Sequence, residues 1–430
     1  MDDSLSREYE STLTRAERRR GGVFNTPLAV ARSVCESVID RVGTVCDPSC
    51  GTGTFLVAAV ERLTALGASP STAASLVVGV EIDSGALAVA RSRLPAGVRL
   101  VQGDGLVFDE PVDFVVGNPP FVDGLAARFL AASCRRARVG VGMIAPASVL
   151  ATDEGAAFRA SGVGVVSVDR LAADVFPAAA VDACALALRW DAPVPAGPTW
   201  ASLLVDGSVP DVALDDDAPA LGESCDVVAG FRQHYYGLRG CVSEGSSGPL
   251  LVTSGSIGLG TMTPGGRFDG VRYSSPRVAV DAIASPAVRS WYSALLRPKV
   301  VVATQTRVLE AAVDDVGAWV PSVPVISVLP ADPSRVWSVL AVLLAPPVTA
   351  WALRRWGGTA LSPSALKLGA PAVRSIPVPS SRPASAASWS TAASKMQAGD
   401  VVGGARAMCT AYGVGEEVHE WWLDRAGLAR

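Results

Sequence analysis

The sequence contains only two histidines, His234 and His419, among its 430 residues. Histidine is the commonest metal ligand and acid–base catalyst, so this scarcity argues against a histidine-based metal site or histidine-dependent catalysis. Eight cysteines are scattered along the chain without one C-x-x-C pair, which argues against a zinc site or a thioredoxin-like centre. The sequence therefore predicts no metal site, and we expect its chemistry to depend on an organic cofactor.

Long apolar runs are also missing. No stretch of eighteen apolar residues occurs, so we predict no membrane span. Residues 1–20 are highly charged and lack the apolar centre of a signal peptide, so we expect a cytoplasmic protein with reduced cysteines. Positive charge is in short supply as well, because the net charge is −4, which counts mildly against nucleic-acid binding.

The composition is otherwise that of a globular protein large enough for two or three domains. Hydrophobic residues make up 49% of the chain and charged residues 18%. Strand–helix alternation stops near residues 195–225, where proline, glycine and aspartate accumulate. Residues 379–394, rich in serine, alanine and proline, are predicted to be a linker. We therefore expect a charged helical lead-in over 1–20, a catalytic domain over 21–200, a second domain over 225–380 and a helical tail over 395–430.

Strand and helix patterns alternate through most of the predicted catalytic domain. Thr26 and Pro27 are typical of a helix start, with Thr26 as N-cap and Pro27 as the first helical residue. The alternation predicts a Rossmann-like α/β fold with a parallel sheet and right-handed crossovers. Ligands of such sheets bind at the carboxyl ends of the strands, and the unusual residues of this region fall there.

The first of these strand ends reads VCDPSCGTGTF. Gly51 and Gly53 allow a tight turn and a close backbone approach to a ligand. Position 56 is leucine where the dinucleotide fingerprint has its third glycine, so a plain tight turn would explain this stretch equally well on its own.

Acidic residues at the next strand ends favour a ligand-binding turn over a plain tight turn. Glu81 is placed to accept hydrogen bonds from both ribose hydroxyls of a nucleoside cofactor, and Asp104 to accept one from an adenine amino group. Asp47 could take the ammonium of a bound amino-acid group. Acceptors for ribose, adenine and ammonium together indicate S-adenosylmethionine, and the predicted cofactor site also includes the neighbours Ser49, Ile82 and Gly105.

The fourth strand ends in VGNPPF. The Asn118 side-chain oxygen and the Pro119 carbonyl are two acceptors, and Pro119 and Pro120 stiffen the loop because their φ angles are fixed. A planar aromatic amine stacked on Phe121 could donate one N–H to each acceptor. Two aligned acceptors would stabilise the positive charge that grows on such a nitrogen during attack on a sulfonium methyl group. The tetrapeptide is thus predicted to be catalytic rather than a mere rigid turn.

These segments, in this order, resemble the TaqI-like, gamma-order N6-adenine DNA methyltransferases of restriction–modification and defence systems. GGVFNTP, DPSCGTGTF, VGVEID, QGDG and VGNPPF carry the resemblance over residues 20–190, and a weaker one continues to 380. It implies a methyltransferase domain followed by an α+β target-recognition domain. It also implies that Thr26, Asp47 and Gly51 line the methionine end of the cofactor, with Asn118 beside it. Phe176 would stack on the flipped base opposite Phe121, which stands where many members have tyrosine.

The resemblance makes double-stranded DNA the expected partner, with a cognate endonuclease or defence subunits encoded separately. From residue 226 to 310, nine basic residues face five acidic ones, and Lys299, Arg307 and Lys367 are candidate DNA contacts. N-P-P-aromatic motifs also occur in methyltransferases that act on cytosine N4, RNA adenine or protein glutamine. These acceptors remain alternatives, as does a non-enzymatic binding subunit with a degenerate pocket.

Overall fold

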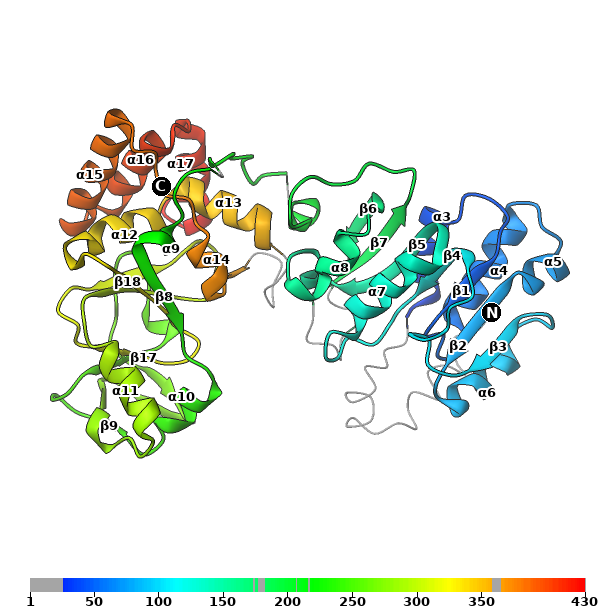
Figure 1. Cartoon of the computed structure of the whole chain (residues 1–430), viewed down its shortest axis with the longest axis horizontal. Helices are drawn as coiled ribbons and strands as arrows, with labels where there is room; N and C mark the ends of the chain where they lie inside the picture. Colours follow the sequence, from blue (N-terminus) through cyan, green and yellow to red (C-terminus); the bar gives the residue numbers. More distant parts are fainter. Residues whose placement is uncertain are drawn as a thin grey trace. The chain divides into compact units, whose positions relative to one another are not determined.

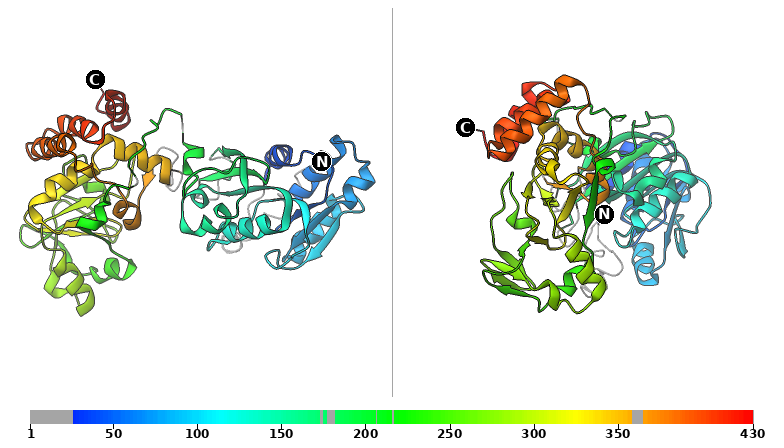
Figure 2. Two further views of the ribbon diagram at one scale, coloured as in Figure 1. Left: turned by 45° about the horizontal axis from the view of Figure 1, so that its top comes forward. Right: turned by 60° about the vertical axis from the view of Figure 1, so that its left-hand side comes forward.

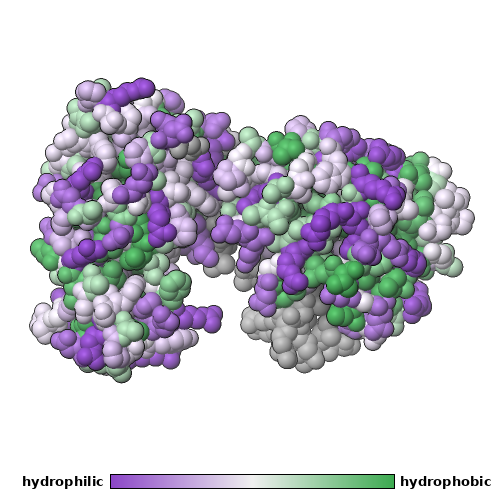
Figure 3. Space-filling model, viewed as in Figure 1, coloured by the Kyte–Doolittle hydropathy of each residue, from purple (hydrophilic) through white to green (hydrophobic). Residues whose placement is uncertain are grey.

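The chain divides into two compact units, one up to Leu204 and the other from Val205 on (Figure 1). The computed structural model describes residues 26–172, 175–176, 182–205, 207–215, 217–357 and 365–429. The predicted lead-in over 1–20 lies outside them. Among the described helices, none by itself is long and apolar enough to cross a bilayer. On the face drawn in Figure 3, polar and apolar residues are intermixed over both units.

Unit 1 is built on a seven-stranded sheet of order β3-β2-β1-β4-β5-β7-β6. Its strands are β1 (Val45–Asp47), β2 (Val77–Glu81), β3 (Arg99–Gln102), β4 (Val112–Gly117), β5 (Ala137–Pro146), β6 (Gly164–Arg170) and β7 (Ala183–Arg189). Its helices are α3 (Leu28–Val38), α4 (Thr54–Ala65), α5 (Pro70–Ser75), α6 (Ser84–Arg93), α7 (Leu125–Arg136) and α8 (Ala156–Arg159). The Rossmann-like prediction is confirmed, and the helices lie on both faces of the sheet (Figures 1 and 2).

The prediction of a wholly parallel sheet is wrong at one strand. The strand β7 pairs antiparallel with both β5 and β6, and only 12 residues separate β6 from β7, which is the lower limit of the connection, usually a helix, that parallel neighbours need. The strands β3, β2, β1, β4 and β5 are parallel throughout. Alternate residues of β4 enter the two cores: Phe114 and Val116 face one apolar layer and Val115 the other.

The helix start at residue 27 also differs from the prediction. Leu28 is the first helical residue of α3 and Pro27 is its N-cap, while the Thr26 side chain makes no capping bond. The Thr26 hydroxyl instead accepts a hydrogen bond from Asn118 Nδ2 at 3.0 Å. A tertiary partner has therefore replaced the local backbone partner that the sequence pattern favoured.

Unit 2 combines small sheets with helices. Its strands are β8 (Cys225–Ala229), β9 (Val242–Glu244), β10 (Leu250–Val252), β11 (Gly266–Phe268), β12 (Val271–Tyr273), β13 (Pro276–Val278), β14 (Lys299–Val302), β15 (Gln305–Thr306), β16 (Ala311–Asp314), β17 (Trp319–Pro321), β18 (Ile326–Pro330) and β19 (Leu366–Lys367). Its helices are α9 (Leu221–Ser224), α10 (Arg232–Gly237), α11 (Pro286–Ala294), α12 (Val336–Leu343), α13 (Pro346–Trp356), α14 (Ala370–Arg374), α15 (Pro383–Gln397), α16 (Val401–Tyr412) and α17 (Glu416–Ala426). The expected α+β character is present, in sheets of order β16-β14-β18-β8 and β17-β10-β13-β9 and the ribbons β11-β12 and β15-β19.

The carboxy-terminal region corrects the predicted linker over 379–394. Residues 383–397 form α15, which starts with Pro383 at its first turn and is rich in alanine, the strongest helix former. Ala392 and Met396 of α15 share one apolar core with Met408 of α16 and Leu340 of α12. The tail predicted over 395–430 is therefore the end of a three-helix layer that packs within unit 2. A low-complexity composition concealed an apolar stripe at helical spacing.

Candidate functional site

The carboxyl ends of the central strands bring the predicted site residues of unit 1 to one edge of the sheet. Asp47 ends β1 and pairs in register with Gly79 of β2, while Glu81 ends β2 two residues further on. On the other side of β1, the strand β4 ends at Gly117, immediately before Asn118. Since these strands are parallel neighbours, the side chains that follow them meet at the same place.

The glycine loop after β1 is tied to the end of β2. Gly51 N–H donates to Glu81 Oε2 at 2.9 Å, and Gly51 and Gly53 have left-handed φ angles of 51° and 87°. Glu81 Oε1 accepts from the N–H groups of Ile82 (2.8 Å) and Asp83 (3.0 Å). The carboxylate is thus held rigidly by three backbone donors. Because a carboxylate has about four acceptor positions, that of Glu81 can still accept a hydrogen bond from a ligand.

Asp47 is the most deeply buried acid of the group, with 1% of its surface exposed. Ser49 N–H donates to Asp47 Oδ1 at 3.0 Å, but burial dominates and raises the pKa of Asp47 from 3.8 to about 8. A Cβ atom at Gly117 would lie 2.7 Å from Asp47 Oδ1, so only glycine lets β4 pass this close. A buried carboxyl group whose charge is not compensated is suited to receive a cationic ligand.

Ser49 supplies a second sign that this loop faces a ligand. Its hydroxyl oxygen is buried and has no hydrogen-bond partner within the described part of the chain. Buried hydroxyl groups are normally satisfied, so an orphaned one marks a place where a further polar group belongs. The donor set around the loop, with a buried acid, a capped carboxylate and an orphaned hydroxyl, fits an amino-acid-bearing nucleoside such as S-adenosylmethionine.

The remaining predicted cofactor residues divide into two kinds. Asp104 is exposed and its Oδ1 accepts from Leu106 N–H at 2.9 Å, while Ile82, directly after β2, is 71% exposed. Both side chains are therefore accessible to an adenine ring. Gly105, by contrast, is buried, and a Cβ there would lie 1.7 Å from the Pro48 carbonyl oxygen. Its role in this structure is to let two loops pack.

Asn118 is half-buried and is held by the residue that precedes α3. Its Nδ2 donates to Thr26 Oγ1 at 3.0 Å, across 92 positions of the sequence. Because this bond occupies the amide nitrogen, the acceptor that the side chain offers is Oδ1, and this oxygen is buried. Pro119, directly after it, is buried, which fixes the loop against the core.

The two aromatic rings predicted to sandwich a base are in contact with each other. The ring centroids of Phe121 and Phe176 are 6.2 Å apart with an interplanar angle of 79°. Stacking on both faces of a base needs two parallel rings about 7 Å apart, twice the usual carbon contact distance. The edge-on arrangement therefore leaves no slot between them, and a base can enter only if the Phe176 ring, which is 5% exposed, moves away.

In unit 2, the prediction that Lys299 contacts DNA is wrong. Lys299 is 0% exposed and forms an ion pair with Asp314, its antiparallel partner on β16. Asp314 also accepts from the N–H groups of Ala318 (2.8 Å) and Trp319 (2.9 Å). The lysine is the first residue of the strand KVVV, whose apolar residues signal burial, and its charge is balanced by Asp314 inside the protein.

We expect Lys299→Ala to destabilise the protein by about 3–5 kcal/mol, because it leaves Asp314 buried without its counter-charge. Urea unfolding should show this loss, while DNA affinity measured below the unfolding transition should be unchanged. The double variant Lys299→Met/Asp314→Asn removes both charges, keeps an acceptor for the N–H groups of Ala318 and Trp319, and should recover most of the stability. Weakened DNA binding by the folded Lys299→Ala variant would show instead that Lys299 contacts DNA.

The other two basic candidates lie together. Lys367 on β19 pairs with Gln305 on β15, and Arg307 directly follows β15. Both side chains are exposed, so the structure brings these two residues, 60 positions apart, onto one short ribbon of unit 2. They stay candidates for contacts with a polyanion.

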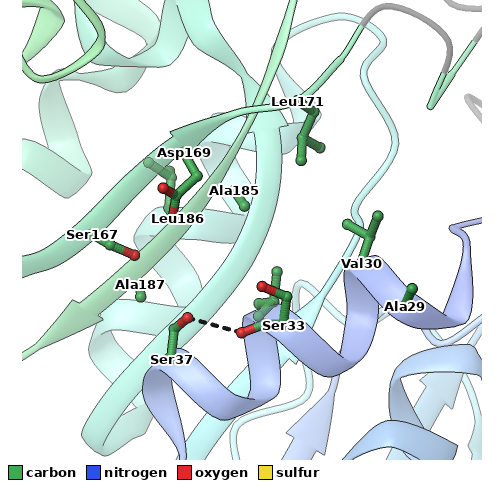
Figure 4. A pocket seen from close by; sticks show the side chains of 11 residues that line it. Ala29, Val30, Ser33, Ser37, Ser167, Asp169, Leu171, Ala185, Leu186 and Ala187 are labelled. Carbon is green, nitrogen blue, oxygen red and sulfur yellow. Dashed lines mark hydrogen bonds between the residues drawn. The ribbon is translucent and has the colours of Figure 1, made fainter.

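A cavity of about 240 Å³ lies elsewhere in unit 1, between α3 and the strands β6 and β7 (Figure 4). Val30 and Ser33 of α3 face Asp169 and Leu171 across it. None of the predicted cofactor or base residues lines this cavity, so it is distinct from the site at the strand ends.

Two structural roles were not predicted from the sequence, those of Thr26 and Gly117. Thr26 was assigned to the cofactor and is bonded to Asn118, which no local pattern indicates. Gly117 sits inside VVGNPP, where a glycine that ends a buried strand signals a close approach, and the structure shows that the approach is to Asp47.

Comparison with known proteins finds similar sequences for the amino-terminal third of the chain. Residues 1–140 match the family model described as N-6 DNA Methylase. The type II methyltransferase M.VspI of Vibrio sp. (strain 343) is 37% identical over 130 residues, 28% of this chain and 30% of that protein. The modification methylase CviBIII of Paramecium bursaria Chlorella virus NC1A is 29% identical over 124 residues, 27% of this chain and 30% of that protein. The chain thus spans about a third of the length of these curated relatives, and the resemblance to N6-adenine DNA methyltransferases inferred from the motifs is confirmed, while the gamma order stays a prediction.

A solved structure extends the likeness in fold to the whole chain. The type IIL restriction–modification enzyme MmeI, solved in complex with DNA, matches over 100% of this chain and 74% of its own, with a TM-score of 0.56. The identity is 11%, so this likeness concerns the fold: a methyltransferase-like sheet followed by a further α/β region.

Proposed function

We propose that this chain, whose residues 1–140 match the N-6 DNA methylase family, transfers the methyl group of S-adenosylmethionine to N6 of a flipped adenine in duplex DNA. The observation that carries the proposal is the corner after β4. Asn118, oriented through Thr26, stands at the same sheet edge as the buried acid Asp47 and the capped carboxylate of Glu81. A cofactor site and an amine-binding corner on adjacent strands are what amino-group methylation requires.

Each residue would then have a defined task. Asp47 would hold the cofactor ammonium, Glu81 the ribose hydroxyls and Asp104 the adenine amino group. S-Adenosylmethionine, when bound, supplies a sulfonium-activated methyl group. The Asn118 side-chain oxygen and the Pro119 carbonyl would accept the two protons of the target amino group, which orients the nitrogen lone pair and stabilises the charge that grows on it.

Duplex DNA is the proposed substrate because the target nitrogen must leave the base stack to reach this corner. Phe121 offers a half-buried ring on which an extruded base can stack. The fold shared with MmeI, a DNA-bound enzyme, supports a recognition role for unit 2. Such an enzyme would act in the cytoplasm, with any cognate endonuclease or defence subunit on a separate chain. Cytosine N4, RNA adenine and protein glutamine remain the alternative acceptors.

Incubation of the purified protein with methyl-labelled S-adenosylmethionine and genomic duplex DNA tests the proposal. Nucleoside digestion of the product should give labelled N6-methyladenine, with single-stranded RNA and protein as unlabelled controls. Label in N4-methylcytosine would identify cytosine N4, rather than adenine N6, as the acceptor. If no methyl group is transferred to DNA of varied sequence, the proposed function is contradicted.

We expect Phe121→Ala to weaken productive DNA binding by about 1–3 kcal/mol, roughly 5- to 150-fold in kcat/KM, because a base loses its stacking partner. Phe121→Tyr keeps the ring and should retain activity. Steady-state kinetics with saturating cofactor measure the effect. Equal activity of the alanine and tyrosine variants would show that this ring does not contact the base.

A further inference from the structure

The hairpin formed by β11 and β12 carries two arginines directly opposite each other. Arg267 and Arg272 are register partners on its antiparallel strands, and both are exposed. They lie one pair away from the turn, at the position where side chains of a two-residue hairpin come closest. Like charges in this arrangement destabilise a sheet, so the pair has a cost that folding alone does not explain.

The hairpin itself is well fixed. Its turn is Asp269-Gly270 with φ angles of 47° and 82°, as a type I′ turn requires. Phe268 is 3% exposed and its ring lies 4.9 Å from that of Tyr235 on α10. Asp269 N–H donates to the Tyr235 hydroxyl at 3.1 Å. The two arginines therefore stand on a rigid support, and their proximity is not a consequence of a loose loop.

Neighbouring arginines of the same part of unit 2 already have partners. Arg239 pairs with Asp269 at 2.8 Å, and Arg277 donates to the carbonyl of Gly248 at 3.0 Å. Arg267 and Arg272 form no ion pair or hydrogen bond with any other residue that the structure describes. Together with Gly266 they line a hollow of about 430 Å³. Two unneutralised guanidinium groups at the rim of one hollow form a site for an anion.

We propose that Arg267 and Arg272 clamp a phosphate of the DNA backbone. This inference rests on the proposed function, which makes duplex DNA the polyanion that unit 2 meets. A phosphate between the two guanidinium groups would relieve their mutual repulsion and accept a charge-assisted hydrogen bond from each. Contacts of this kind position the protein on DNA without reading sequence, so the clamp would act on any duplex.

The test is the salt dependence of binding to a fluorescent duplex of arbitrary sequence. Each lost phosphate contact lowers the slope of log affinity against log salt by about 0.9, so Arg267→Ala/Arg272→Ala, which removes the single clamped phosphate, should lower it by about 0.9. The affinity advantage of the wild-type protein over this variant should then shrink about 3.5-fold between 50 and 200 mM salt, because the fourfold rise in salt is raised to the power of the slope difference. The variant Arg382→Ala/Arg406→Ala removes the same charge from the exposed N-cap of α15 and from an exposed position of α16, and should keep the wild-type slope.

Arg272→Glu separates recognition from stability. It places opposite charges at the cross-strand pair, so the melting temperature should be equal to or above that of the wild type. DNA affinity should nevertheless fall below that of the double alanine variant. A wild-type slope in the double alanine variant, or an equal loss in the α15/α16 control, would overturn the clamp while leaving methyl transfer intact. A wild-type protein that neither binds nor methylates DNA would instead overturn the proposed function, and the clamp with it.

Discussion

Asn118→Ala is expected to slow methyl transfer by about 10²–10³-fold, the usual effect of deleting one preorganised polar contact to a transition state. The side chain is half-buried at the edge of the sheet and anchored through Thr26, so its removal leaves β4 and the core intact. Single-turnover rates with saturating cofactor and DNA measure the chemical step. Cofactor affinity by calorimetry and the melting temperature should both stay near their wild-type values.

Thr26 provides the matched control for this variant. Thr26→Val keeps the shape but removes the acceptor of the 3.0 Å bond from Asn118 Nδ2. We expect a smaller fall in rate, about tenfold, because the amide is then held by fewer contacts. Thr26→Ser restores the hydroxyl and should restore most of the rate. Unchanged transfer in Asn118→Ala would remove this residue from the catalytic site.

Asp47→Asn is expected to stabilise the protein in the absence of cofactor and, at the same time, to impair cofactor binding. Burial raises the pKa of Asp47 from 3.8 to about 8, so the folded state keeps a proton that the unfolded state loses between these values. The stability of the wild-type protein should therefore fall as pH rises from about 4 to about 8, since the unfolded state there binds fewer protons. The asparagine variant has no carboxyl group to ionise and escapes this fall.

The difference in melting temperature between Asp47→Asn and wild type should thus be small near pH 4 and largest above pH 8. Differential scanning fluorimetry across this range measures it, and Asp109→Asn, an exposed acid of the same unit, should show no such trend. Cofactor affinity at pH 8 should drop at least about tenfold, because the ammonium loses a charged partner. A stabilised variant that still binds the cofactor with wild-type affinity would mean that Asp47 has a purely structural role.

The sheet edge could be predicted because it follows from chain direction. Asp47, Glu81 and Asn118 each end a predicted strand, and parallel strands bring such ends together regardless of the details of packing. Tertiary partners could not be predicted in the same way. The bond from Asn118 to Thr26 and the passage of Gly117 beside Asp47 depend on how β4 packs against its neighbours.

In unit 2, by contrast, several features were not predicted correctly from the sequence. Lys299 was assigned from its charge alone, although its apolar neighbours mark a buried strand and Asp314 lies 15 positions away. The segment 383–397 was assigned from its composition, although alanine and serine are compatible with a helix once an apolar core is available. Arg267 and Arg272 are recognised as a pair only from their cross-strand register, which places them directly opposite each other. For Lys299 the deciding partner lies on another strand, and for 383–397 it is an apolar core built from other helices.

A crystal structure of the protein with sinefungin, an S-adenosylmethionine analogue that cannot transfer a methyl group, tests the central claim most directly. We predict that its ammonium contacts Asp47, that its ribose hydroxyls contact Glu81, and that its amine at the methyl position points toward Asn118. Binding at another place, such as the cavity between α3 and β6–β7, with Asp47 and Glu81 unchanged, would contradict the account.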